Sequence, residues 1–168
     1  MTVPKKPLIV LFLCAHNSAR SILAEALLNH LGQGRFKAFS AGSSPRDNQQ
    51  PNPVGLQVLR AAGIATDGLR SKSWDEFAGA EAPQMDLIIT VCDNAAGEVC
   101  PYWPGHPATA HWGYADPSTM EGTEEQKLVA FRQTLQAIRH RLSLLVNLSD
   151  ERLEQTALEY SARSLANT

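Results

Sequence analysis

The pattern of apolar and polar positions divides the chain into alternating strand-like and helix-like segments. Largely apolar segments of strand length cover residues 8–13, 36–41, 86–91 and about 108–112. The first is apolar at every position, which is typical of a strand buried on both faces of a parallel sheet. We therefore predict four strands, of which the first is central.

Helices are predicted between and after these runs. Apolar residues recur at helical spacing through residues 22–31, and glycines follow that segment. Asn52 and Pro53 are a favourable cap and first position for a second helix, and Ser73 opens a short third one. A capping box of Thr123 with Gln126 opens the longest helix, whose apolar face continues to about residue 145.

Strands that alternate with helices predict an α/β fold with a single four-stranded parallel sheet flanked by helices on both faces. We expect the spatial order second, first, third, fourth strand. Residues 1–148 are assigned to this domain, and residues 149–168 to a helical tail. The tail helix would run from 150 to about 163 and pack on the surface through a thin apolar stripe of Leu153, Ala157 and Tyr160.

Composition and charge narrow the classes of function. The chain has 168 residues, 43% of them hydrophobic, and a net charge of −2 without a basic stripe, which argues against a nucleic-acid partner. No apolar stretch approaches the ~20 residues of a membrane span. Three cysteines are too few and odd in number for a secreted disulfide scaffold. A cytoplasmic protein with catalytic cysteines is the simpler interpretation.

The chemistry is predicted to lie in the loop that follows the first strand. This loop begins at Cys14. Small residues allow successive backbone N–H groups to surround one tetrahedral anion, and the following helix directs its positive end at the same point. Arg20 can hold two oxyanion oxygens with its planar guanidinium. The same field favours the thiolate of Cys14, to which Ser21 can donate a hydrogen bond. An inert core cysteine would not need this polar loop. The candidate oxyanion-binding residues are Ala15, His16, Asn17, Ser18, Ala19, Arg20 and Ser21.

Residues 10–21 resemble the phosphate loop of the low-molecular-weight protein tyrosine phosphatase superfamily, and within it the chain resembles the arsenate reductases. Further matching motifs are Phe39-Ser40-Ala41-Gly42, Thr90-Val91-Cys92, His111-Trp112-Gly113, Asp116-Pro117 and the segment 121–125. The resemblance extends from residue 8 to about residue 145. It implies the fold of that superfamily and an enzyme that reduces arsenate to arsenite, as in arsenical resistance.

The resemblance implies a role for each matching residue. Cys14 would attack arsenic, while Arg20 and the loop amides bind the oxyanion and Asn17 braces the loop. Asp116 would be the general acid that protonates the departing oxygen. Composition alone would instead favour Asp116 as a turn residue before Pro117. Negative charge on the thiolate and the oxyanion would favour the protonated carboxyl that an acid needs.

The two remaining cysteines are predicted to form a redox relay. By resemblance, Cys92 would attack the Cys14–arsenic adduct and release arsenite, and Cys100 would then take over the disulfide. Along one continuous helix the two Cα atoms of Cys92 and Cys100 would lie about 12 Å apart, whereas a disulfide needs roughly 4.4–6.8 Å. The segment between them must therefore be a loop or must unwind. Thioredoxin or a glutathione–glutaredoxin couple would supply electrons, and no bound cofactor is expected.

Two other functions fit part of the sequence. A phosphotyrosine phosphatase would use the same loop and acid without Cys92 or Cys100, but Ser118 and Thr119 follow Asp116-Pro117 where such enzymes usually carry tyrosines. A non-catalytic binder of metal or metalloid could use the cysteines with His106 and His111. Their spacing matches no common zinc pattern, so no metal site is assigned.

Overall fold

A four-stranded sheet forms the centre of the molecule in the computed structural model, which describes residues 6–93, 103 and 107–168. The strands follow the spatial order β2-β1-β3-β4, and every neighbouring pair is parallel. Both the order and the direction confirm the prediction. The strands are β1 (Leu8–Cys14), β2 (Phe36–Gly42), β3 (Leu87–Thr90) and β4 (Ala108–His111).

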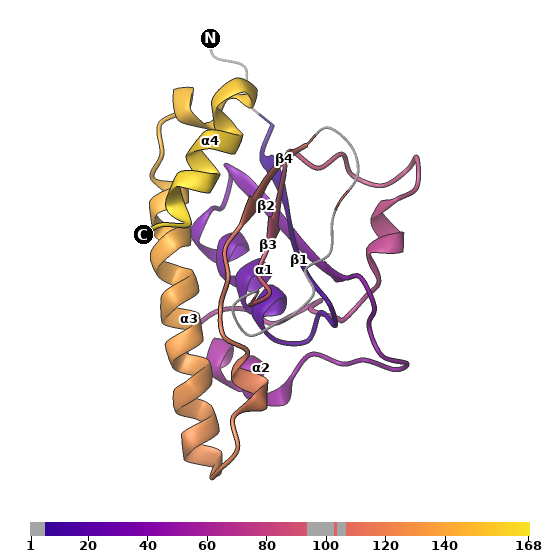
Figure 1. Cartoon of the computed structure of the whole chain (residues 1–168), viewed down its shortest axis with the longest axis vertical. Coiled ribbons are helices and arrows are strands. Elements are labelled where there is room, and N and C mark those ends of the chain that lie inside the picture. Colours follow the sequence, from indigo (N-terminus) through magenta and orange to yellow (C-terminus); the bar gives the residue numbers. More distant parts are fainter. Residues whose placement is uncertain (1–5, 94–102, 104–106) are drawn as a thin grey trace.

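The four α-helices that the structure describes all contribute to the larger hydrophobic cluster, on one face of the sheet. Figure 1 shows α3 as the long helix along this side, with α4 beside its end. The predicted caps form: Asn52 accepts from the backbone N–H of Val54, and Thr123 makes the capping box with Gln126. The helices are α1 (Arg20–Leu31), α2 (Pro53–Ala61), α3 (Glu124–Val146) and α4 (Gln155–Leu165).

The opposite face of the sheet carries a smaller cluster. Leu11, Leu13 and Ile88 point to this side and pack with aromatic residues that include Phe39. The short helix predicted after Ser73 covers this face as a single 3-10 turn, η1 (Trp74–Phe77). In the described part of the chain the two faces are therefore covered unequally, by long helices on one side and by η1 on the other.

Parallel pairing brings the carboxyl ends of the strands to one edge of the sheet. Cys14 pairs in register with Gly42, and Thr90 pairs with His111 on the far side. β1 lies between β2 and β3, which explains why its apolar run is unbroken: both of its faces are buried. The edge that holds Cys14 is where ligands bind in folds of this kind.

The tail beyond residue 148 is helical, but its buried side differs from the predicted stripe. A 3-10 turn, η4 (Glu151–Leu153), comes first, and extended backbone at Glu154 separates it from α4. This interruption shifts the helical phase, so Leu158 and Ala162 are buried while Tyr160 is 78% exposed. Tyr160 was therefore wrongly placed in the apolar stripe. None of the described helices is both long enough and apolar enough to span a membrane.

Candidate active site

The loop between β1 and α1 starts at Cys14 and ends at Arg20, the first residue of the helix. Asn17 adopts the left-handed conformation, with φ of 57°, which turns the loop back on itself. As a result the backbone N–H of Asn17 donates to Cys14 Sγ at 3.3 Å. No side-chain cap hydrogen bond forms at the start of α1, and the positive end of this helix adjoins the loop, where it favours an anion.

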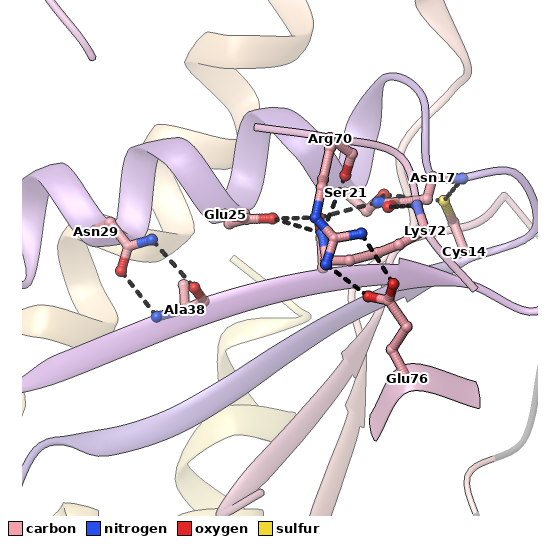
Figure 2. A network of polar contacts seen from close by, with 10 residues as sticks. Cys14, Asn17, Ser21, Glu25, Asn29, Ala38, Arg70, Lys72 and Glu76 are labelled. Atoms are coloured by element: carbon pink, nitrogen blue, oxygen red, sulfur yellow. Dashed lines mark hydrogen bonds and ion pairs between the residues drawn. The ribbon is translucent and has the colours of Figure 1, made fainter. Parts of the chain in front are cut away.

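The side chain of Asn17 determines which way a buried hydrogen-bond chain runs (Figure 2). The backbone N–H of Lys72 donates to Asn17 Oδ1 at 3.0 Å, and a backbone donor cannot be reversed. Asn17 Nδ2 therefore donates to Ser21 Oγ at 2.8 Å and to Ser40 Oγ at 2.9 Å. Because Ser21 Oγ accepts from Asn17, its own hydrogen is free for Cys14 Sγ, 3.1 Å away. Two donors, the Asn17 N–H and the Ser21 hydroxyl, thus face the sulfur.

Arg20 and Asp116 meet across the site, although 96 residue numbers separate them. Arg20 is 7% exposed. Its Nη1 donates to the carbonyl oxygen of Tyr114 at 2.9 Å, and its Nη2 lies 3.5 Å from Asp116 Oδ2. Asp116 Oδ1 accepts from the backbone N–H and the hydroxyl of Ser118, because Asp116 caps the 3-10 turn η3 (Pro117–Thr119). Asp116 is therefore both a turn residue and a neighbour of the loop.

A cavity of about 320 Å³ opens above this loop. Cys92 follows β3 directly, and the structure places it in the wall of the same cavity as Cys14. Cys14 is a free thiol, whereas Cys92 is disulfide-bonded. The predicted residues Cys100 and His106 lie outside the described residues. The cavity is lined by Cys14, Ala15, His16, Asn17, Ser18, Ala19, Arg20, Ser43, Ser44, Cys92 and Asp116.

His111 lies at the end of β4 and is hydrogen-bonded to its partner in register on β3. Its Nδ1 is hydrogen-bonded to Thr90 Oγ1 at 2.8 Å. Burial, followed by the positive charge of Arg141, lowers the pKa of His111 and favours the neutral ring. Among the residues that the structure describes, no group of three or more histidine, cysteine and acidic side chains is arranged to hold a metal ion.

Several contacts that hold the loop come from residues without an obvious sequence signal. The backbone N–H of Ser43 donates to the Cys14 carbonyl at 3.0 Å, and that of Ser44 donates to the Ala15 carbonyl at 2.9 Å. The carbonyl oxygen of Ser44 is also hydrogen-bonded to His16 Nδ1, at 3.0 Å. These contacts follow from the parallel pairing of β1 with β2, so only the strand register could have indicated them.

Gly42 is required by the close approach of β2 to this loop. A Cβ atom at position 42 would lie 2.5 Å from the carbonyl oxygen of Ala15, and this is backbone that cannot rotate away. We expect Gly42→Ala to lower the free energy of unfolding by about 1–3 kcal/mol and to weaken phosphate binding. Gly79→Ala is the matched control, since a Cβ atom at position 79 would have no other atom within 4 Å. Urea unfolding and phosphate titration measure both effects; equal behaviour of the two variants would contradict the prediction.

The loop at the carboxyl end of β1 begins with a cysteine and ends with an arginine, and an aspartate lies opposite it. This arrangement defines a class of phosphate-loop enzymes. The chain matches the family described as low molecular weight phosphotyrosine protein phosphatase over residues 9–157. It belongs to this family.

Particular relatives within the family are arsenate reductases. The chain is 34% identical over 134 residues to the arsenate reductase of Bacillus subtilis, covering 80% of this chain and 91% of the relative. It is 37% identical over 134 residues to that of Bacillus licheniformis, with 79% and 91% covered. The crystal structure of arsenate reductase from Archaeoglobus fulgidus superimposes with a TM-score of 0.66 at 28% identity, covering 83% of this chain and 99% of that one.

Proposed function

We propose that this protein reduces arsenate to arsenite through a relay of its cysteines. The observation that carries the proposal is the presence of a second cysteine, Cys92, in the wall of the cavity that also contains Cys14, Arg20 and Asp116. A phosphatase of the same fold needs the nucleophile, the anion loop and the acid, but no second thiol. The names of the Bacillus relatives support the same choice.

The first step joins arsenic to the protein. Arsenate binds to the loop amides and Arg20, and the Cys14 thiolate attacks arsenic to form a sulfur–arsenic bond. A hydroxyl group of the arsenate leaves with the electron pair of its arsenic–oxygen bond and takes a proton from Asp116, so that water departs. The hydrogen bonds from Ser21 and from the Asn17 amide favour the thiolate that this step needs.

The second step transfers the electrons. The Cys92 thiolate attacks Cys14 Sγ and forms a disulfide, while the electron pair of the sulfur–arsenic bond stays on arsenic. Arsenic(V) thereby becomes arsenic(III) and leaves as arsenite. Cys100 then attacks Cys92, which releases Cys14 as a thiolate. A free Cys14 beside a disulfide-bonded Cys92 is the distribution expected after this transfer.

Completion of the cycle needs two electrons from outside the chain. A thiol reductant, thioredoxin or glutathione with glutaredoxin, would reduce the last disulfide, and no bound cofactor takes part. Such reductants keep thiols reduced in the cytoplasm, and we therefore propose that the protein is cytoplasmic.

The decisive experiment is arsenite formation by the purified protein. Arsenate is supplied with the thioredoxin system or with glutathione and glutaredoxin in separate reactions, and arsenite is quantified. We expect arsenite in at least one of them. Hydrolysis of an aryl phosphate without arsenite formation in either reaction would instead assign the protein as a phosphatase.

Oxyanion binding should depend on the shape of the Arg20 side chain as well as on its charge. Arg20→Lys keeps the charge but loses the planar fork, so we expect phosphate to bind about 10- to 100-fold more weakly, as for the loss of ~1.5–3 kcal/mol in a charge-assisted bond. Calorimetric phosphate titration measures this. Arg35→Lys is the control, because Arg35 bonds instead to the carbonyls of Val146 and Leu148. Unchanged affinity in Arg20→Lys would remove Arg20 from the site.

A further inference from the structure

A buried ion pair of Lys72 and Glu25 lies near the anion loop (Figure 2), and neither residue lines the cavity. Lys72 Nζ lies 3.7 Å from Glu25 Oε1, and the two side chains are 7% and 12% exposed. Glu25 belongs to α1, whereas Lys72 belongs to the segment that precedes η1. Burial raises the pKa of Glu25 and lowers that of Lys72, and each charge partly offsets the cost for the other. Removal of one partner would therefore leave an uncompensated buried charge.

The pair is joined to the sulfur of Cys14 by a continuous hydrogen-bond chain. The Ser40 hydroxyl accepts from Asn17 Nδ2 and so donates its own hydrogen to Glu25 Oε1. Asn17 also donates to Ser21, whose hydrogen is then free for Cys14. Every link in this chain has a defined direction, because the Asn17 amide is held by a backbone donor.

That backbone donor belongs to Lys72 itself. Its N–H orients Asn17 Oδ1, while its carbonyl oxygen accepts from the Gly42 N–H at 2.9 Å. Its ammonium group donates to the Arg70 carbonyl at 3.0 Å in addition to pairing with Glu25. Lys72 therefore contacts two members of the hydrogen-bond chain. Its side chain pairs with Glu25, and its backbone N–H donates to Asn17.

We propose that Lys72 is a positioning residue for the Cys14 nucleophile, acting through its buried pair with Glu25. The ion pair anchors the backbone of residue 72, this backbone fixes the amide of Asn17, and the amide directs the Ser21 hydroxyl to the sulfur. The proposal rests on the proposed role of Cys14 as nucleophile. It adds a residue outside the cavity, 58 positions along the chain from Cys14, that governs how readily the thiol ionises.

The test follows the ionisation of Cys14 in the fully reduced chain without arsenate, so its result does not depend on turnover. The rate of alkylation by iodoacetamide is measured against pH, and peptide mapping separates Cys14 from the other cysteines. Lys72→Met should move the midpoint of Cys14 ionisation upward by about one pH unit, a tenfold loss of thiolate below it. The charged and titratable side chains that line the cavity with Cys14 are unchanged in this variant; they are His16, Arg20, Cys92 and Asp116.

A second variant separates positioning from the loss of a positive charge. Glu25→Gln combined with Lys72→Met removes both charges, so the net charge is unchanged and no buried ion is left unpaired, which keeps the fold accessible. A midpoint that rises in this double variant as well supports positioning. A midpoint that rises only in Lys72→Met would show that the unpaired charge of Glu25 acts on Cys14 through its electric field alone, and it would overturn the proposal.

The matched control is Arg70→Met, two residues away. Arg70 pairs with Glu76 on the surface, where its side chain is 61% exposed. Arg70→Met should leave the Cys14 midpoint within a few tenths of a unit of wild type. A Lys72→Met protein that loses thermal stability but titrates like wild type at Cys14 would show that Lys72 only stabilises the fold, and the proposal would be wrong.

Discussion

Arsenate added to the Cys14→Ser variant should give no arsenite and no arsenic bound to protein with any reductant. Cys14 is the sulfur that the loop surrounds, with donors from Asn17 and Ser21, and a serine hydroxyl in its place would stay protonated. Removal of a covalent nucleophile costs on the order of 10⁶-fold in turnover. Mass spectrometry of the protein after one equivalent of arsenate measures the adduct, and arsenite release measures turnover.

The other two cysteine variants should stop at different steps of the same relay. Cys92→Ser should accumulate arsenic on Cys14, because Cys92 is the thiol that the relay uses to attack the adduct. Cys100→Ser should complete a single turnover, release arsenite and trap a Cys14–Cys92 disulfide. Disulfide mapping by mass spectrometry distinguishes these products, and each variant serves as the control for the other.

Two results would contradict the proposed roles of Cys92 and Cys100 in the relay. If Cys92→Ser turns over at the wild-type rate, Cys92 is a structural neighbour of the site and arsenic must leave by another thiol. If Cys100→Ser cycles normally with every reductant, Cys100 is structural and a glutathione-type thiol resolves the first disulfide. Seven residues separate Cys92 from Cys100, and the Cys100→Ser variant tests whether Cys100 takes over the disulfide.

Asp116→Asn should slow arsenate turnover by about 10²–10⁴-fold, the usual contribution of a general acid. The variant should fold, because an asparagine oxygen can still accept from the N–H and hydroxyl of Ser118 and cap η3. Steady-state turnover and calorimetric phosphate binding are measured on the same preparation. We expect the rate to fall far more than the affinity.

The comparison of rate with affinity matters because Asp116 also lies 3.5 Å from Arg20. If Asp116 acted only by holding the guanidinium, phosphate affinity would fall by the same factor as turnover. Ser118→Ala is the control, since it removes one contact to Oδ1 and keeps the acid. Wild-type turnover in Asp116→Asn would leave Asp116 as a turn residue alone.

Local features of the sequence were enough to predict most of the fold. The apolar run of β1 and the capping box at Thr123 each depend on residues within a few positions, and both form as expected. The parallel direction of the strands followed from the alternation of strands and helices, because parallel strands need crossover connections. The tail shows the limit of this reasoning: one extended residue, Glu154, changes the helical phase, and Tyr160 faces solvent in place of Leu158.

The same contrast holds within the candidate site. Cys14, Arg20 and the residues between them form one local motif, since a strand end, a turn and a helix start lie within seven residues. Tertiary structure alone decided what surrounds this motif. Lys72 reaches Asn17 across 55 positions and Tyr114 reaches Arg20 across 94, through a backbone N–H and a carbonyl that every amino acid except proline could supply. Such contacts depend on the path of the backbone, so no pattern of residue types predicts them. Only the tertiary packing around β1 places these backbone groups beside the loop that holds Cys14.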